Sequence, residues 1–352
     1  MAKKIKGFFG KIAKFFKELP SNFVCGLKVI KNWFKNLPKN IKASFPKVKK
    51  YLKYNWQIYV LFLPSLVWII MFVFIPFVTN VIMSFQDYNT TAGIFGSKFV
   101  GFKNYIQFFS ADGFLNLLTN TLLLNVLVLA IGFPAAIILA ISIYESKSGI
   151  VKGVAQTATF LPFFISAVVV CNLVIEFLKA DTGMLTNILS TIGIIGKDEN
   201  LLNNPKAFRL IYAIMELWQT VGYNSLIYLA ALSAIDTSLY EASSIDGAGK
   251  FKQIWHVTLP GIAPTIIITL IMKVGKLLSM GYEKVLLLQN NFNKDVSEII
   301  STYVYNVSLN PTVGQANFGM AATIGLFDAA VAIVLVSLVN KIAKKVSDTA
   351  LW

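Results

Sequence analysis

The chain has 352 residues, of which 56% are hydrophobic and only 14% are charged. A soluble domain carries about 25% charged residues, so this composition argues against an ordinary soluble enzyme and predicts a bundle of membrane helices. The net charge is +15, and two cysteines and one histidine are too few for a disulfide framework or a zinc-type ligand cluster.

The positive charge is concentrated in the arm 1–55, which contains fifteen lysines and a single acid, Glu18. Hydrophobic residues recur there at helical spacing with lysines between them, which predicts amphipathic helices on a membrane surface with anionic headgroups. A solvated tail is the alternative. Because the chain has one arginine, Arg209, and specific nucleic-acid recognition relies on arginine forks, we expect no nucleic-acid partner.

Six long apolar segments follow the arm, and each is long enough to cross a bilayer. Backbone groups in lipid must be hydrogen-bonded internally, so each segment is predicted to be a helix. The predicted spans are 58–84, 116–143, 153–177, 208–233, 261–285 and 316–340. The predicted fold class is therefore all-α and integral to the membrane, with a membrane domain at 56–346 and a short tail at 347–352.

The placement of lysine and arginine predicts how this bundle is oriented in a bacterial cell membrane. With the amino terminus in the cytoplasm, the inside segments hold 22 lysines and arginines, whereas the outside loops hold six. This bias predicts a multi-pass protein with both termini in the cytoplasm. It also places the loop 234–260 on the cytoplasmic side.

That cytoplasmic loop carries the most specific pattern in the sequence. Ser238 and Glu241 have the spacing of a capping box, which predicts that a helix begins there. Gly247 and Gly249 are expected to break this helix, and Pro260 is expected to end a second one. Two short helices with small side chains suit a groove on a soluble partner. An ordinary loop that caps itself is the alternative.

The loop resembles the EAA loop of ABC importer permeases, in which Glu-Ala-Ala is followed at a fixed distance by Gly and then by Ile-x-Leu-Pro. The matching residues are Glu241, Ala242, Ser243, Asp246, Gly247, Val257, Leu259 and Pro260. Ser243 stands where the family has alanine, and Val257 stands where it has isoleucine. The resemblance covers about 56–346 and implies the type I importer permease fold with six transmembrane helices. It also implies that 236–260 is a coupling-helix loop, in which 239–250 transmits the closure of an ATPase. The coupling residues that it implies are Glu241, Ala242, Ser243, Asp246, Gly247, Leu259 and Pro260.

The same resemblance implies the partners of the chain. They are a second permease subunit, expected to be a different chain, two ATPase subunits, and an extracellular solute-binding protein. Stretches such as 221–236 and 280–290 resemble the carbohydrate permeases of the maltose type that handle oligosaccharides and polysaccharide fragments. The chain is then a non-catalytic transport subunit without a cofactor, because ATP and magnesium are bound by the partner ATPase. No Gly-x-x-x-x-Gly-Lys-Ser/Thr pattern occurs in the sequence.

Polar and aromatic residues inside predicted spans are costly in lipid and are therefore candidates for a substrate pathway. The expected lining residues are Trp218, Tyr223, Asn224 and Tyr228 on the fourth span and Tyr282 and Glu283 at the outer end of the fifth. Structural roles are the alternative. The aromatic residues could belong to an interfacial belt, and Glu216 could pair with Lys273 or Lys276.

Two other classes of protein are weighed against the importer. An ion-coupled secondary transporter of a small polar solute usually has inverted repeats in two halves, and we find no such halves. A membrane enzyme would need a triad, a metal cluster or a carboxylate dyad, and His256 stands alone. The identity of the sugar and the role of the arm stay open.

Overall fold

The computed structural model describes residues 54–346, except 112, 197–198, 279–280 and 310–315. Nearly all of the predicted basic arm and the whole of the predicted tail 347–352 lie outside the described residues. The chain divides into two compact units, Met1–Pro76 and Phe77–Trp352.

The described part of the first unit is a single apolar helix. It comprises α3 (Trp56–Ile69), a π-helical segment η1 (Ile70–Phe74) and the start of α4 (Ile75–Ser84). Together these form one candidate membrane span, Trp56–Ser84, which confirms the first predicted segment. Pro76 has no N–H to donate, and the wider π turn before it accommodates the missing hydrogen bond.

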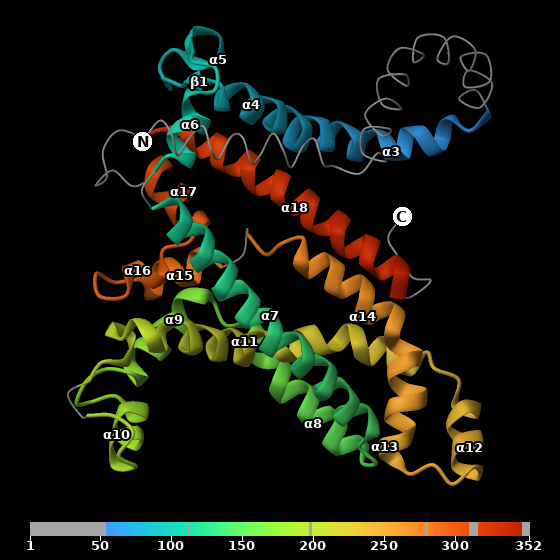
Figure 1. Ribbon diagram of the computed structural model, residues 1–352. Coiled ribbons are helices and arrows are strands. Elements are labelled where there is room, and N and C mark those ends of the chain that lie inside the picture. The colour runs from blue at the N-terminus through green and yellow to red at the C-terminus, as the bar shows by residue number, and fades with distance from the viewer. Residues whose placement is uncertain (1–53, 112, 197–198, 279–280, 310–315, 347–352) are drawn as a thin grey trace. The chain divides into compact units, whose positions relative to one another are not determined.

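The second unit is built around two long helices, α7 (Phe114–Glu145) and α11 (Pro205–Ser233), which pack against each other (Figure 1). These helices confirm the second predicted segment and the helical character of the fourth. Where α14 (Leu259–Val274) joins them, a hydrophobic core forms from Ala136, Ala140, Tyr228, Leu232 and Ile262. The small alanines of α7 allow the backbones to approach closely, which is how membrane helices gain packing energy.

The third predicted span, 153–177, is wrong as a continuous helix. α8 (Gly149–Phe160) and a 3₁₀ turn, η2 (Leu161–Phe164), are followed by α9 (Ala167–Phe177), with a bend of 97° at the break. Pro162 lies at the start of the 3₁₀ turn, where the loss of its N–H interrupts the helical hydrogen bonds. The pair is therefore a broken span or a re-entrant element.

The fifth predicted span, 261–285, is wrong in its extent. The membrane-length helix begins earlier, with α13 (Lys250–Gln253), runs through a π-helical segment, η4 (Ile254–Thr258), and ends with α14. Pro260 does not end a helix as predicted. A π turn again precedes the proline, as in the first unit, so the chain continues as one helix.

Four helices of the described chain are long and apolar enough to cross a membrane, and the bent pair α8–α9 would make a fifth. The four are Trp56–Ser84, Phe114–Glu145, Lys250–Val274 and Phe318–Lys345. The last lies in α18 (Phe318–Val346) and confirms the sixth predicted segment. α11 is long enough, but polar residues such as Glu216, Gln219 and Asn224 interrupt its apolar sequence.

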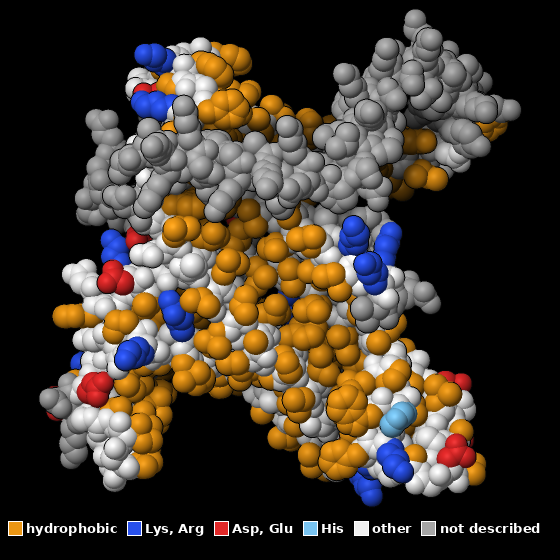
Figure 2. Space-filling model, in the orientation of Figure 1, with side chains coloured by type: hydrophobic (Ala, Val, Ile, Leu, Met, Phe, Trp, Pro, Cys, Tyr) orange, Lys and Arg blue, Asp and Glu red, His pale blue; other side chains and the backbone are white. Residues whose placement is uncertain are grey.

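Short elements connect these helices. They are β1 (Gln86–Asp87) paired antiparallel with β2 (Lys98–Phe99), α5 (Gly93–Gly96), α6 (Lys103–Phe109), α10 (Met184–Thr191), η3 (Leu201–Asn203), α12 (Thr237–Ile245), α15 (Tyr282–Leu288), α16 (Lys294–Ser297) and α17 (Ile300–Ser308). Figure 2 shows a broad hydrophobic surface on the visible face, with most of the charged side chains toward its margins. Exposed apolar side chains on α7 and α18, such as Leu123 and Ile333, suit contact with lipid.

Candidate functional site

The predicted coupling loop folds as two helices joined by a turn, α12 and α13, at one end of the second unit (Figure 1). α12 begins at Asp236, whose carboxylate accepts a hydrogen bond from the backbone N–H of Ser238 at 2.9 Å. The predicted capping box of Ser238 and Glu241 is therefore wrong, because the cap lies two residues earlier. The hydrogen bonds from Ser238 also lower the pKa of Asp236.

A glycine turn separates the two helices. Gly247 has a φ of +75°, which confirms that a left-handed residue ends α12. Gly249 has a φ of −71°, so its backbone does not require glycine, and it serves as the N-cap residue of α13. Only one of the two glycines thus acts as predicted.

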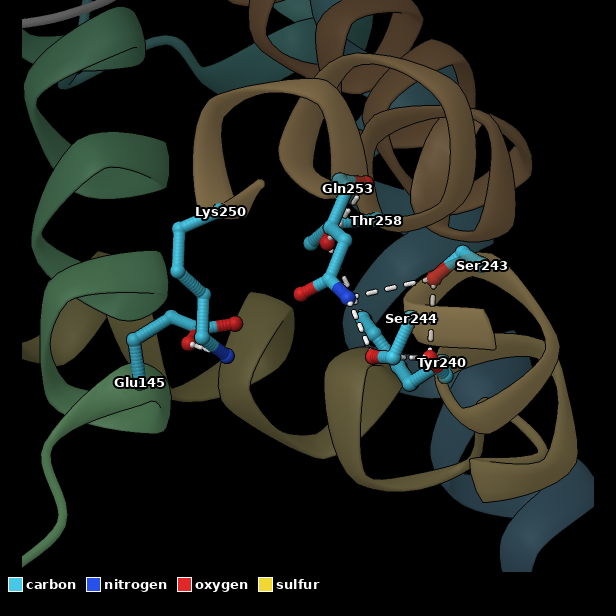
Figure 3. Close-up of polar contacts among 7 residues, drawn as sticks. All are labelled: Glu145, Tyr240, Ser243, Ser244, Lys250, Gln253 and Thr258. Carbon is cyan, nitrogen blue, oxygen red and sulfur yellow. Dashed lines mark hydrogen bonds and ion pairs between the residues drawn. The ribbon is translucent and has the colours of Figure 1, made fainter. Parts of the chain in front are cut away.

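Two sets of hydrogen bonds fasten α12 to the start of the long helix (Figure 3). The Gln253 side chain is buried, and its amide donates to Ser243 Oγ at 3.2 Å and to Ser244 Oγ at 2.9 Å. The hydroxyls of Tyr240 and Thr258 share a hydrogen bond of 3.0 Å. These bonds join α12 to the helix that continues into α14.

A further contact joins this helix pair to the end of α7. Lys250 Nζ lies 2.6 Å from Glu145 Oε2 (Figure 3). The Lys250 side chain is 66% exposed, so we expect the ion pair to add little stability. Both residues of the pair line an open groove of about 860 Å³ between the end of α7 and α12.

The residues predicted to couple to an ATPase separate into two groups. Glu241, Ala242, Asp246 and Gly247 are exposed on α12 and its C-terminal turn, and Pro260 is exposed at the start of α14. Ser243 and Leu259 are half-buried. Ser243 Oγ donates to the Tyr240 carbonyl and accepts from Gln253, so Ser243 holds α12 in place instead of facing outward.

Large apolar side chains are also exposed at this end of the molecule. The exposed fraction is 87% for Ile245, 82% for Phe251 and 67% for Trp255. Exposed apolar residues beside a polar helix are typical of a surface that contacts another protein or a membrane. Ile245 was missed as a candidate because an isoleucine at helical spacing is more often part of a core.

Replacing Gln253 with alanine is expected to loosen α12 without unfolding the bundle. The substitution removes two hydrogen bonds at a buried position, each worth about 0.5–1.5 kcal/mol. Backbone amides of 237–245 should then exchange with solvent about tenfold faster, measured by hydrogen–deuterium exchange. Lys252→Ala, at an exposed position next in sequence, should leave exchange unchanged. Equal exchange in Gln253→Ala and the wild type would mean that these bonds do not hold α12.

A second candidate site is a cavity of about 210 Å³ lined by α7, α11, α14 and Phe163 of η2. Its polar and aromatic lining includes Asn125, Phe133, Glu216, Thr220, Tyr223, Asn224 and Lys273. Tyr223 stacks on Phe163, with ring centroids 3.9 Å apart and an angle of 4° between the rings. Lys273 Nζ donates to Asn224 Oδ1 at 3.1 Å.

The acid in this cavity has a partner from another element. Glu216 Oε2 pairs with Lys284 Nζ of α15 at 2.5 Å, and both side chains are largely buried. Glu216 thus pairs with neither Lys273 nor Lys276, which were the alternatives considered from the sequence. Lys284 was missed because it lies outside the apolar core of its predicted span, and only the fold brings it to Glu216.

The residues predicted for the substrate pathway do not share one cavity. Tyr223 and Asn224 line the cavity just described, whereas Tyr282 lines a separate cavity of about 300 Å³ with Asp328. Trp218 and Glu283 are exposed. Tyr228 is 1% exposed, and its hydroxyl shares a hydrogen bond of 2.9 Å with Thr269, so it is part of the core.

The family model described as "Binding-protein-dependent transport system inner membrane component" matches residues 132–348. The polygalacturonan/rhamnogalacturonan transport system permease protein YteP of Bacillus subtilis (strain 168) is 39% identical over 84% of this chain and 90% of its own length. The lactose transport system permease protein LacF of Rhizobium radiobacter is 28% identical over 80% of this chain and 91% of its own.

A solved structure is similar over most of the chain. It is a chain in the crystal structure of a bacterial alginate ABC transporter in complex with an alginate pentasaccharide-bound periplasmic protein. The TM-score is 0.77 and the sequence identity is 34%, and the match covers 86% of this chain and 99% of that one. Most of this chain therefore shares its fold with a chain of that transporter complex.

Proposed function

The chain belongs to the family of binding-protein-dependent transport system inner membrane components, and we propose that it is the permease subunit of an ATP-driven ABC importer for a carbohydrate of oligosaccharide size. The similarity to the alginate transporter chain carries this proposal, because it extends over 99% of that chain. The names of the relatives support a carbohydrate, since they include polygalacturonan and lactose permeases. The family fits an importer and not an ion-coupled secondary transporter.

We infer that six helices cross the membrane. The bent pair α8–α9 and the polar helix α11 would join the four apolar spans. An even number of spans fits the lysine and arginine bias, which favours both termini in the cytoplasm. On this topology α12 faces the cytoplasm and α15 lies toward the outside. The arm 1–55 would then lie on the cytoplasmic leaflet, where its lysines are attracted by anionic headgroups.

We propose that α12 is the coupling helix, with Glu241, Ala242, Asp246 and Gly247 in the contact with the ATPase. Their exposure supports this role, and so do the hydrogen bonds that join α12 to the helix ending in α14. Ser243 would instead keep α12 in position against that helix, because it accepts a hydrogen bond from Gln253. Leu259 and Pro260 stay in the predicted coupling set. No cofactor is assigned to this chain, since ATP and magnesium would be bound by two ATPase subunits.

In the proposed cycle, this chain transmits the movement of the ATPase subunits to the cavity. Closure of the ATPase pair on ATP moves α12, and Gln253 and Tyr240 pass the movement to α14. Because α14 lines the cavity through Lys273, its movement changes the access of the cavity between the two sides. A second permease subunit completes the pathway, and an extracellular binding protein delivers the sugar. The energy comes from the different affinities of the partners for the two states.

The decisive test is co-purification of an ATPase from detergent-solubilised membranes. We expect an ATPase subunit to accompany the tagged wild type and to be reduced at least tenfold in Glu241→Lys/Gly247→Asp, because both substitutions fall on the exposed tip of α12. Quantitative mass spectrometry measures the ratio. Glu176→Lys is the matched control, because it reverses an exposed acid on α9. An intact wild-type protein without any ATPase would overturn the proposal.

A further inference from the structure

The cavity between α7, α11 and α14 contains an ammonium group that the fold does not neutralise. Lys273 is the penultimate residue of the membrane-length helix Lys250–Val274, and a charged side chain in a membrane helix is costly and usually has a function. Its hydrogen bond to Asn224 Oδ1 uses one of three N–H donors. Among the described residues, Lys273 forms no ion pair.

The other charges near Lys273 do not cancel it. Glu216 lines the same cavity, but Lys284 already pairs with it at 2.5 Å. The three groups together carry one positive charge. Lys276, the next lysine along the chain, is exposed and does not line the cavity. The cavity therefore has a net positive charge, and the two remaining N–H donors of Lys273 are free to bind an anion.

The direction of the Lys273 side chain argues against a role at the membrane surface. Lysines near the ends of membrane helices often extend toward the headgroups. Here the ammonium instead contacts an amide of α11, a neighbouring helix, and the side chain is half-buried beside the cavity. Its position is thus set by the cavity and not by the lipid surface.

We propose that this cavity binds a uronic acid unit, with Lys273 binding the carboxylate and Asn224 orienting the ammonium. The inference rests on the proposed function and narrows its substrate to an acidic oligosaccharide. The remaining lining suits a sugar ring: it includes the aromatic ring of Phe133 and the stacked pair of Tyr223 and Phe163, and Thr220 contributes a polar edge. The cavity of about 210 Å³ is smaller than the roughly 300–1,000 Å³ that encloses drug-sized ligands, so it takes one unit of a longer chain.

The test compares two ligands with the same sugar backbone: trigalacturonate, which is an anion, and its fully methyl-esterified form, which is neutral. Binding to the full-length chain in nanodiscs is measured by saturation-transfer NMR at low ionic strength, without a binding protein, so that any selectivity belongs to the membrane chain. We expect the wild type to bind the acid at least tenfold more tightly than the ester. The reason is that the acid forms one hydrogen bond between charged groups that the ester cannot form.

Three variants locate the selectivity. Lys273→Met should remove the preference for the acid while changing the affinity for the ester less than twofold, and Lys273→Arg should retain a preference. Lys276→Met makes the same change at an exposed position and should keep the full preference. The inference is overturned if the wild type shows no preference or binds neither ligand. It is equally overturned if Lys276→Met loses the preference as Lys273→Met does.

None of these binding outcomes decides whether the chain is an importer permease, which co-purification of an ATPase tests separately. A chain that co-purifies with an ATPase but binds acid and ester equally would remain an importer permease with a substrate of another kind. Loss of ATPase co-purification would contradict the importer itself, whatever the cavity binds.

Discussion

Replacing Gly222 with leucine is expected to separate α11 from α8 and η2 and to prevent stable folding of the second unit. A Cβ atom at Gly222 would overlap backbone atoms of Thr159 and Phe160. Backbone in a packed helix cannot retreat as a flexible side chain can, and small residues are what permit such close approach of membrane helices. Overpacking costs about 1–3 kcal/mol in ordinary cores, and a backbone clash should exceed that range.

The thermal unfolding midpoint in detergent, followed by intrinsic fluorescence, measures the effect. Gly153→Leu is the matched control, because it places the same side chain on α8 at a position where a Cβ atom would meet nothing within 4 Å. We expect a large loss of Tm for Gly222→Leu and little change for Gly153→Leu. A difference below about 2 °C between the two variants, equivalent to less than about 1 kcal/mol, would show that α8 does not pack on α11 as described.

Replacing Lys284 with methionine is expected to destabilise the second unit by about 3–5 kcal/mol. The substitution leaves the Glu216 carboxylate without its partner at a position where its side chain is only 15% exposed. A buried charge without an ion-pair partner is costly because the surrounding helices do not replace the water that it loses. Lys273, the lysine that lines the cavity, donates to Asn224 and forms no ion pair with Glu216. The free energy of unfolding is measured by titration of mixed micelles with a denaturing detergent.

Two comparisons separate charge from packing. Glu216→Gln/Lys284→Met removes both charges and should recover most of the stability lost in the single variant. Lys179→Met breaks the ion pair with Glu176, in which both side chains are more than half exposed, and should change stability by less than about 1 kcal/mol. If the double variant were as unstable as Lys284→Met, the pair would contribute through packing and not through charge.

The extent of individual helices was predictable where the apolar sequence is continuous. The segments 58–84, 116–143 and 316–340 each correspond to a membrane-length helix, because lipid requires every backbone group to be bonded within its own segment. Proline, in contrast, was an unreliable guide. Pro134 lies inside the continuous helix α7, Pro162 lies at a bend of 97°, and the helix through Pro260 continues after a π turn. The outcome depends on how neighbouring helices satisfy the freed backbone groups.

The residue pattern singled out the loop 236–260 as the predicted coupling loop, but it did not predict the internal arrangement of that loop. Glu241 and Gly247 were identified from their spacing, and the left-handed φ of Gly247 was expected because such a turn requires glycine. The cap at Asp236 was missed, because Ser238 and Glu241 have the spacing of a capping box and so predicted the cap at Ser238. The role of Gln253 was missed as well, since a glutamine in a polar loop gives no sign that its amide will be buried.

The sequence by itself determined that this chain is a helical membrane protein of the importer permease family. Composition and the length of each apolar segment can be read directly from the sequence, and the predicted coupling loop is a continuous sequence motif. Only the tertiary structure decided which charges meet: Glu216 pairs with Lys284 and not with Lys273 or Lys276, so Lys273 is left as the cation of the cavity. The physical reason is that an ion pair forms between groups within about 4 Å, and the distance between side chains on α11, α14 and α15 depends on how those helices pack.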